Sequence, residues 1–185
     1  MNAYDFDKTI YPGDSATHFW WYCVRRHPAA FSSALRALGP LSKGLAGRLS
    51  RGEVKQALYT CLRYVPDPEK EAAAFWDGHI DRIYPWYLER KRDDDLIISA
   101  SPAFLIGEAC RRLGVRWMAT PMDPSTGVIP GKNCRGEEKV RRFREAYGDA
   151  AVEEFYSDSL SDRPMMELAA RGYLVKNGAV LRRVE

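Results

Sequence analysis

Strand-like and helix-like segments alternate along the second half of the chain, and this alternation constrains the fold more than any other feature. Apolar runs that read as strands occur at "LII" (96–98), "VRWMAT" (115–120) and "VEEFYSDS" (152–159), followed by the shorter runs "YLVKN" and "AVLRRV". Segments with helical spacing of apolar residues separate the first three runs. Such alternation is typical of βαβ units, in which parallel strands form one sheet. The pattern therefore predicts an α/β fold.

The N-terminal run "NAYDF" also reads as a strand, but no helical partner of its own lies nearby. The turn cluster "YPGDS" follows it, and the pattern is then almost entirely helical as far as residue 92. We expect the first strand to join the same sheet as the later ones. The sequence thus predicts a Rossmann-like core of mainly parallel strands, formed by residues 1–12 and 93–185, with an α-helical cap at 13–92 inserted into it.

Within the expected cap, helical patterns cover four segments, which are residues 15–27, 29–39, 52–62 and 67–92. Pro85 should kink or split the last of them, because proline breaks the hydrogen-bond pattern of a helix interior. In the core, "MDPSTGVIPG" (122–131) is rich in turn residues and is interpreted as an irregular excursion or a small hairpin.

Composition and charge argue against several classes of partner. The net charge is +3 and the pI is about 8.7, which is too weak a balance to indicate nucleic acid. A membrane-spanning helix needs a run of about 18 apolar residues, and the sequence contains no such run. The 4 cysteines form no Cys-x-x-Cys pair and no His lies at zinc-ligand spacing. We expect reduced thiols, no secretory signal and a cytoplasmic location.

Polar side chains are concentrated where the predicted strands end. In parallel α/β sheets, ligands bind outside the carboxyl ends of the strands. The residues at these ends are Asp5, Asp7, Thr9, Ser99, Ala100, Ser101, Asp158 and Asp162, with Lys139 at the start of a following helix. Each alone has an ordinary explanation, such as a turn, a helix cap or a solvated surface. Together they place carboxylates, hydroxyls and one ammonium at one edge of one sheet.

This set of groups predicts Mg²⁺ together with phosphate. Crowded carboxylates repel one another and resist ionisation, and a hard divalent cation relieves that repulsion. Mg²⁺ takes oxygen ligands, uses only a few carboxylates and often keeps a substrate phosphate. The hydroxyls of Thr9 and Ser99, the backbone N–H groups near Ala100, and the Lys139 ammonium are phosphate-binding groups.

The motifs "DFDKT", "IISAS", "GEEKV" and "SDSLSD", in this order, resemble those of the haloacid dehalogenase (HAD) superfamily of aspartate-nucleophile phosphotransferases. The helical insertion between the first two motifs and the stretch "GKNCRGEEK" resemble the phosphoserine-phosphatase-like branch, subfamily IB. The motifs extend from residue 5 to 162 and so cover essentially the whole chain. The resemblance implies a Mg²⁺-dependent hydrolase of small organic phosphomonoesters that acts through an aspartyl-phosphate.

By this resemblance, Asp5 is the nucleophile, and Asp7 is the acid of the first step and the base of the second. The phosphoryl group would be held by hydroxyls, backbone N–H groups and one ammonium, from Thr9, Ser99, Ala100 and Lys139. The Asp5 carboxylate, the Asp7 carbonyl and Asp158 would bind the metal. Asp162 would act in the second shell or orient Lys139.

Two features differ from the resembled family. Lys8 stands between Asp7 and Thr9, where glycine is usual. Phosphoserine phosphatases usually carry a Glu shortly after the first motif and an Arg in the cap, which hold the amino acid. Here Asp14 takes about that place, and the aromatic pair Trp20 and Trp21 follows. We therefore expect these three cap residues to face a small phosphomonoester other than phosphoserine.

Several alternatives remain open at this point. The cap aromatics could simply form the core of a helical bundle. The enzyme could transfer phosphate to an acceptor other than water, or the chain could be an inactive phosphate-binding relic, against which the intact motifs argue. A receiver-type phosphoacceptor domain is rejected, because it lacks the large helical insertion and places its acceptor Asp on a middle strand.

Overall fold

The computed structural model describes residues 1–31, 56 and 58–184. Its six-stranded sheet has the order β3-β2-β1-β4-β5-β6, and every neighbouring pair is parallel except β5 and β6. The strands are β1 (Ala3–Tyr4), β2 (Leu96–Pro102), β3 (Arg116–Thr120), β4 (Glu154–Ser157), β5 (Arg171–Lys176) and β6 (Ala179–Val184). The predicted α/β fold with a mainly parallel sheet is therefore confirmed.

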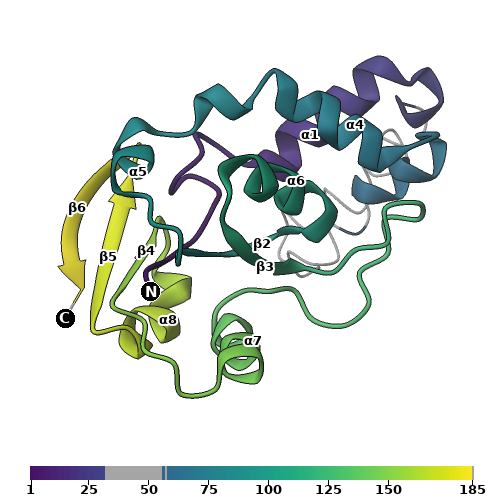
Figure 1. Ribbon diagram of the computed structural model, residues 1–185. Coiled ribbons are helices and arrows are strands. Elements are labelled where there is room, and N and C mark those ends of the chain that lie inside the picture. The colour runs from purple at the N-terminus through teal and green to yellow at the C-terminus, as the bar shows by residue number, and fades with distance from the viewer. Residues whose placement is uncertain (32–55, 57, 185) are drawn as a thin grey trace.

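Helices cover both faces of this sheet. Among the described residues, the α-helices are α1 (Ser15–Arg26), α4 (Pro68–Asp77), α5 (Pro85–Arg90), α6 (Ala103–Leu113), α7 (Glu137–Tyr147) and α8 (Arg163–Leu168). Short 3₁₀ turns are η1 (Thr60–Tyr64), η2 (Ile80–Arg82) and η3 (Leu160–Asp162). Helices α4, α5 and α6 lie on one face, and α7 and α8 lie on the other (Figure 1). The helices expected at 29–39 and 52–62 lie largely outside the described residues.

The apolar run of β2 is continuous because both of its faces are buried. Ile97 points into the cluster beneath α4 and α6, whereas Leu96 and Ile98 point into the cluster beneath α7 and α8. Successive side chains of a strand alternate between faces, so a strand between two helical layers needs apolar residues at every position. This explains why "LII" shows no alternation with polar residues.

Local sequence signals account for several boundaries. Asp14 caps α1 by accepting the N–H of Thr17 at 2.7 Å, and Pro85 occupies the first turn of α5. The expected split near Pro85 is thus confirmed. The hairpin considered for 122–131 does not form: this segment contains no strand. Its turn is closed by the Asp123 N–H, which donates to the Val128 carbonyl at 2.9 Å.

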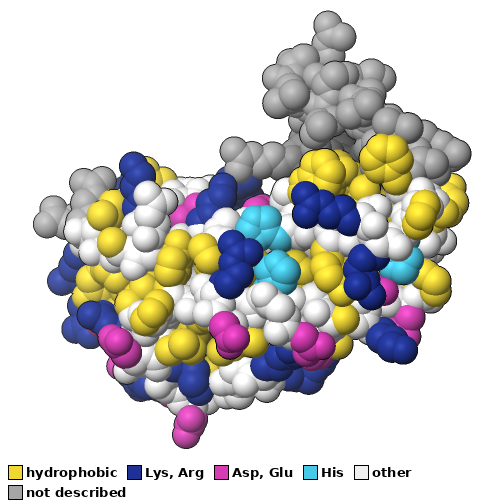
Figure 2. Space-filling view, turned by 90° about the horizontal axis from the view of Figure 1, so that it is seen from above, with side chains coloured by type: hydrophobic (Ala, Val, Ile, Leu, Met, Phe, Trp, Pro, Cys, Tyr) yellow, Lys and Arg dark blue, Asp and Glu magenta, His cyan; other side chains and the backbone are white. Residues whose placement is uncertain are grey.

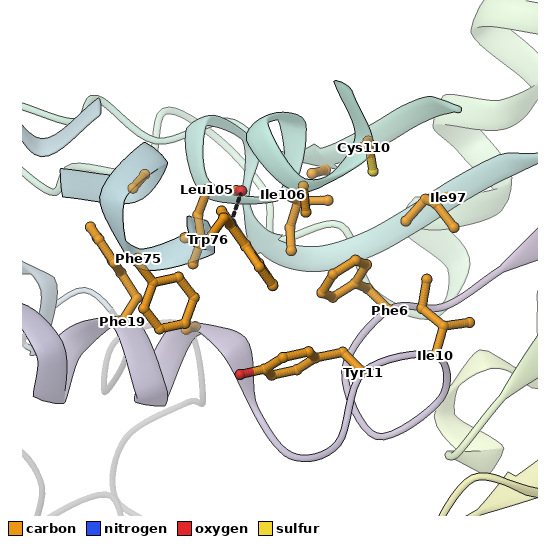
Figure 3. Close-up of a cluster of buried hydrophobic side chains, with 14 of the residues drawn as sticks. Phe6, Ile10, Tyr11, Phe19, Phe75, Trp76, Ile97, Leu105, Ile106 and Cys110 are labelled. Atoms are coloured by element: carbon orange, nitrogen blue, oxygen red, sulfur yellow. Dashed lines mark hydrogen bonds between the residues drawn. The ribbon is translucent and has the colours of Figure 1, made fainter. Parts of the chain in front are cut away.

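One hydrophobic cluster joins the helices α1 and α4 to the α/β layers. Trp76 of α4 lies among Phe6, Phe75 and Leu105, and its indole N–H donates to the Leu105 carbonyl at 2.8 Å (Figure 3). The rings of Phe6 and Trp76 meet edge to face with their centroids 5.6 Å apart. The described cap helices therefore share their buried core with the sheet. The boundaries of cap and core given above stay a prediction.

The outer face of the α4 and α5 layer carries Lys and Arg side chains interspersed with Asp, Glu and hydrophobic ones (Figure 2). No helix in the described part of the chain is long and apolar enough to cross a membrane. The 4 cysteines are buried and free of disulfides.

Replacing Trp76 with Phe should lower the free energy of unfolding by about 1–3 kcal/mol, because the buried indole hydrogen bond to the Leu105 carbonyl is lost and the cluster loses volume. Urea denaturation monitored by circular dichroism measures this loss. Trp117→Phe is the matched control, since Trp117 is 36% exposed, and it should cost clearly less. Equal losses in the two variants would show that the Trp76 contact adds nothing.

Candidate active site

Three adjacent strands deliver their polar residues to one edge of the sheet. Tyr4 of β1 pairs in parallel with Ile97 of β2 on one side and with Tyr156 of β4 on the other. The Asp5 N–H donates to the Tyr156 carbonyl at 2.8 Å, which continues this pairing to the strand end. The residues that follow each strand therefore emerge side by side. This arrangement is the one expected from the general rule for parallel sheets.

A buried ammonium lies between two carboxylates at this edge. The Nζ of Lys139, a residue only 1% exposed, is 2.7 Å from Asp5 Oδ1 and 2.6 Å from Asp162 Oδ2. The Ser157 hydroxyl donates to the same oxygen of Asp162 at 3.0 Å, and the Gly136 N–H donates to its other oxygen at 3.3 Å. Asp162 is thus held from both sides and in turn orients Lys139 toward Asp5.

The charges in this cluster shift one another's ionisation. Burial raises the pKa of Asp5 to about 7, Lys139 opposes the rise, and the Asp162 charge adds to it. Burial by itself would lower the pKa of Lys139, but the charges of Asp5 and Asp162 outweigh it and raise that pKa above its ordinary value. The ammonium therefore stays charged, and the cluster gains an excess negative charge when Asp5 ionises.

Both oxygens of the Asp7 carboxylate accept hydrogen bonds. The Ser15 N–H, in the first turn of α1, donates to Oδ1 at 2.7 Å, and the Ser101 hydroxyl donates to Oδ2. Burial raises the pKa of Asp7, and the neighbouring charge of Asp14 raises it further, whereas the two serine donors oppose the rise. A carboxyl group with a raised pKa is suited to giving and taking a proton.

The predicted phosphate-binding groups are held by the backbone. The Thr9 hydroxyl accepts the N–H of Asp158 at 2.9 Å, and the Ser99 hydroxyl accepts the N–H of Ser101 at 3.0 Å. A hydroxyl that accepts such a bond keeps its own proton for donation to another group. The carbonyl of Ala100 faces the Thr120 hydroxyl at 2.9 Å. Thr9 and Ser99 are therefore oriented and still able to donate.

The residues predicted to bind metal fit Mg²⁺ by their donor chemistry. Lys139 binds Asp5 through Oδ1, and the Asp158 carboxylate is half-buried. Burial raises the pKa of Asp158, with Lys8 opposing and Asp162 adding to the rise. In the described part of the chain, no three or more His, Cys, Asp or Glu side chains form a group that could by itself hold a metal ion. Two carboxylates and the Asp7 carbonyl match the few protein oxygens that Mg²⁺ uses.

The three predicted cap residues each have a partner within the protein. Asp14 caps α1, and the indole N–H of Trp20 donates to the Leu58 carbonyl at 3.0 Å. Trp21 is 47% exposed and lies beneath the guanidinium of Arg25, 5.8 Å from its ring centroid. Their contact with a substrate stays a prediction.

Sequence reasoning did not predict the contacts that hold the predicted site residues in place. Ser101 and the backbone of Ser15 bind Asp7, and Ser157 binds Asp162. Ser101 was expected at the strand end, because "SAS" places two hydroxyls there, but its contact with Asp7 was not. Ser15 acts through its backbone, which no side-chain pattern reveals.

A model of the family described as haloacid dehalogenase-like hydrolases matches residues 3–167, a span that includes every predicted site residue. The chain belongs to this family. The family prediction made from the four motifs is therefore confirmed.

A curated relative and several solved structures are similar to this chain over most of its length. The protein CicA from Caulobacter vibrioides is 28% identical over 195 residues, which cover 95% of this chain and 86% of CicA. A structure of a Bordetella pertussis protein of unknown function is similar with a TM-score of 0.77 at 21% identity, covering 94% of this chain and 88% of that one. A probable phosphoserine phosphatase from Vibrio cholerae has a TM-score of 0.69 at 13% identity, covering 97% and 61%. The structural neighbours thus include phosphoserine phosphatase-like proteins with this fold.

In metal-free buffer, Asp5→Asn should make the protein more stable than wild type at pH 8. The folded-state pKa of Asp5, about 7, lies above its value in the unfolded chain. Its favourable contribution is therefore complete below the unfolded pKa and is lost as the pH rises through 7. The free energy of unfolding of Asp5→Asn, relative to that of wild type, should therefore increase by about 2 kcal/mol between pH 5 and pH 8.

Urea denaturation with EDTA present, repeated at several pH values, measures this difference. Asp149→Asn is the control, because that carboxylate is fully exposed, and it should show no such trend. A difference that stays constant over the whole pH range would contradict the assigned pKa of Asp5.

Proposed function

We propose that this protein is a Mg²⁺-dependent hydrolase of small organic phosphomonoesters that acts through an aspartyl-phosphate on Asp5. The contact that carries the proposal is the buried Lys139, whose ammonium lies 2.7 Å from Asp5 Oδ1. An ammonium beside a nucleophilic carboxylate can also attract the phosphate that the carboxylate attacks. Asp7, two residues further on, provides the acid and base.

In the first step, an Asp5 carboxylate oxygen forms a bond to phosphorus. The bond between phosphorus and the ester oxygen breaks, and its electron pair stays on that oxygen. The proton carried by Asp7 passes to the leaving oxygen, so that the product departs as an alcohol. The raised pKa of Asp7 favours the protonated form that this step requires.

In the second step, a water oxygen forms a bond to phosphorus and gives its proton to the Asp7 carboxylate. The bond between phosphorus and the Asp5 oxygen breaks, and Asp5 regains its carboxylate. Inorganic phosphate leaves, and Asp7 is again protonated for the next cycle. Atoms and charges balance over the two steps, with water as the only co-substrate.

The negative oxygens of the transferring phosphoryl group need donors at both steps. The donors assigned to them are Thr9, Ser99, the backbone near Ala100, and Lys139. Fixed donors of this kind stabilise charge without reorganising during the reaction. Mg²⁺, held by the Asp5 carboxylate, the Asp7 carbonyl and Asp158, would neutralise further charge on the same oxygens. Asp162 keeps Lys139 in position.

The substrate is proposed to differ from phosphoserine, although phosphoserine phosphatase-like proteins share the fold. Asp14 stands where a substrate-binding Glu is expected, but its carboxylate accepts the Thr17 N–H as a helix cap. A carboxylate used in this way is less free to hold an amino group. The exposed indole of Trp21 instead favours a substrate with an apolar or cationic alcohol portion.

Asp5→Asn should abolish turnover of phosphomonoesters, because an amide cannot attack phosphorus. EDTA should likewise abolish wild-type turnover, and added Mg²⁺ should restore it. Phosphate release from a panel of phosphomonoesters, with circular dichroism to verify the fold, measures both effects. Asp149→Asn controls for the loss of a carboxylate elsewhere. Activity that survives in Asp5→Asn or in EDTA would refute the mechanism, and inactivity of the wild type on every ester would favour the binding relic.

Phosphoserine should not be the best substrate in that panel. The kcat/KM of the preferred ester should exceed that of phosphoserine by at least tenfold, which corresponds to about 1.4 kcal/mol of transition-state preference. The panel should include esters of cationic, apolar and hydroxy-acid alcohols under identical Mg²⁺ concentrations. If phosphoserine instead leads by tenfold, the interpretation of Asp14 and of the cap aromatics is wrong.

A further inference from the structure

Strand β2 is irregular where it enters the site. Ser99 pairs with Ala119 of β3, and Pro102 pairs with the next residue, Thr120. Three steps along β2 therefore match one step along β3, so Ala100 and Ser101 form a bulge. Bulges redirect side chains and are common beside active sites. Here the bulge lies at the end of β2, next to the loop that follows β1.

The bulge brings Ser101 into contact with two predicted site residues. Its hydroxyl donates to Asp7 Oδ2, and its backbone N–H donates to the Ser99 hydroxyl at 3.0 Å. Ser101 is only 1% exposed, so water does not replace these contacts. One buried residue thus bridges the proposed proton-transfer group and a proposed phosphate-binding group.

The two oxygens of Asp7 have different kinds of donor. Oδ1 accepts the Ser15 backbone N–H at 2.7 Å, and this donor is fixed by helix α1. Oδ2 accepts a hydroxyl, which can rotate and can also act as an acceptor. Rotation of a carboxylate about its last torsion is only weakly restricted, so one donor alone does not set its plane. The Ser101 hydroxyl is a second donor, and the two donors together fix the plane of the Asp7 carboxylate.

We propose that Ser101 is a positioning residue for proton transfer by Asp7. This inference rests on the proposed function, because it concerns the same acid and base. Ser101 orients the Asp7 carboxylate so that its proton can reach the leaving oxygen, and it remains a suitable partner when Asp7 is protonated because its hydroxyl can accept. It acts through Asp7 rather than on the substrate.

If Ser101 has this role, the effect of removing its hydroxyl should depend on whether the leaving group needs a proton. An aryl ester such as p-nitrophenyl phosphate leaves without needing a proton, so its transfer to Asp5 is insensitive to the position of Asp7. The alkyl ester 2-(4-nitrophenyl)ethyl phosphate is similar in shape but leaves as an alkoxide that must be protonated. A merely structural role for Ser101 would affect both esters equally.

The experiment measures phosphorylation of the protein by rapid quench and intact mass, with each of these two esters and Mg²⁺. Ser101→Ala should slow labelling by the alkyl ester by about 10–100-fold and labelling by the aryl ester by less than about threefold. Ser101→Cys keeps the volume and has a weak donor, so it should show the same split, at least fivefold, if the alanine variant does not fold. Ser125→Ala is the matched control, because it removes another serine-to-aspartate hydrogen bond, to Asp123 in a turn outside the site, and should change neither rate.

A double-variant cycle tests whether Ser101 acts through Asp7. Asp7→Asn should by itself slow labelling by the alkyl ester, and adding Ser101→Ala should cause little further loss. If the rate losses of the two single variants multiply in the double variant, or if Ser101→Ala slows labelling by the two esters equally, the role of Ser101 is overturned while the proposed function stays intact. Absence of labelling in the wild type with both esters would overturn the proposed function itself, and the role of Ser101 with it.

Discussion

The Lys139 ammonium between Asp5 and Asp162 is the contact on which the geometry of the site depends. It joins the end of β1, the start of α7 and the turn η3, which are far apart in the sequence. A buried charge that loses a partner costs several kcal/mol, so these three segments are stable only when they meet. The register of β1 between β2 and β4 then places the remaining polar groups around this cluster.

The same cluster contains an unbalanced negative charge when Asp5 is ionised, and this imbalance fits the proposed binding of a cation. One ammonium faces two carboxylates, and burial together with the Asp162 charge holds the pKa of Asp5 near 7. Such a site is less stable than a neutral one of the same shape, and functional sites commonly carry costs of this kind. A cation bound at Asp5 and Asp158 would relieve the repulsion, and binding to the folded state alone would stabilise it.

The alternation of apolar runs and helices was enough to predict the sheet, because period and turn residues are local properties. The rule that ligands bind at the carboxyl ends of parallel strands then identified Asp5, Asp7 and Asp158. The rule also placed Ser101 at this edge, but it could not predict the contact with Asp7, because that contact depends on a bulge defined by pairing with β3. The sequence pattern also could not show that Trp76 joins α4 to α6, because the spacing of apolar residues within a segment does not reveal contacts with distant segments. The chemical roles of these residues stay predictions.

The contacts of Asp7 link the chemistry to the cap as well as to the core. Its Oδ1 is held by the first turn of α1, which the Asp14 cap stabilises, and its Oδ2 is held by the bulge of β2. Asp14 also raises the pKa of Asp7 through its charge. Displacement of the start of α1 would therefore remove one donor and one charge from Asp7 together. Asp7, the proposed proton-transfer group, keeps both of its donors only when the start of α1 and the bulge of β2 are in position, so the start of α1 is part of the candidate site.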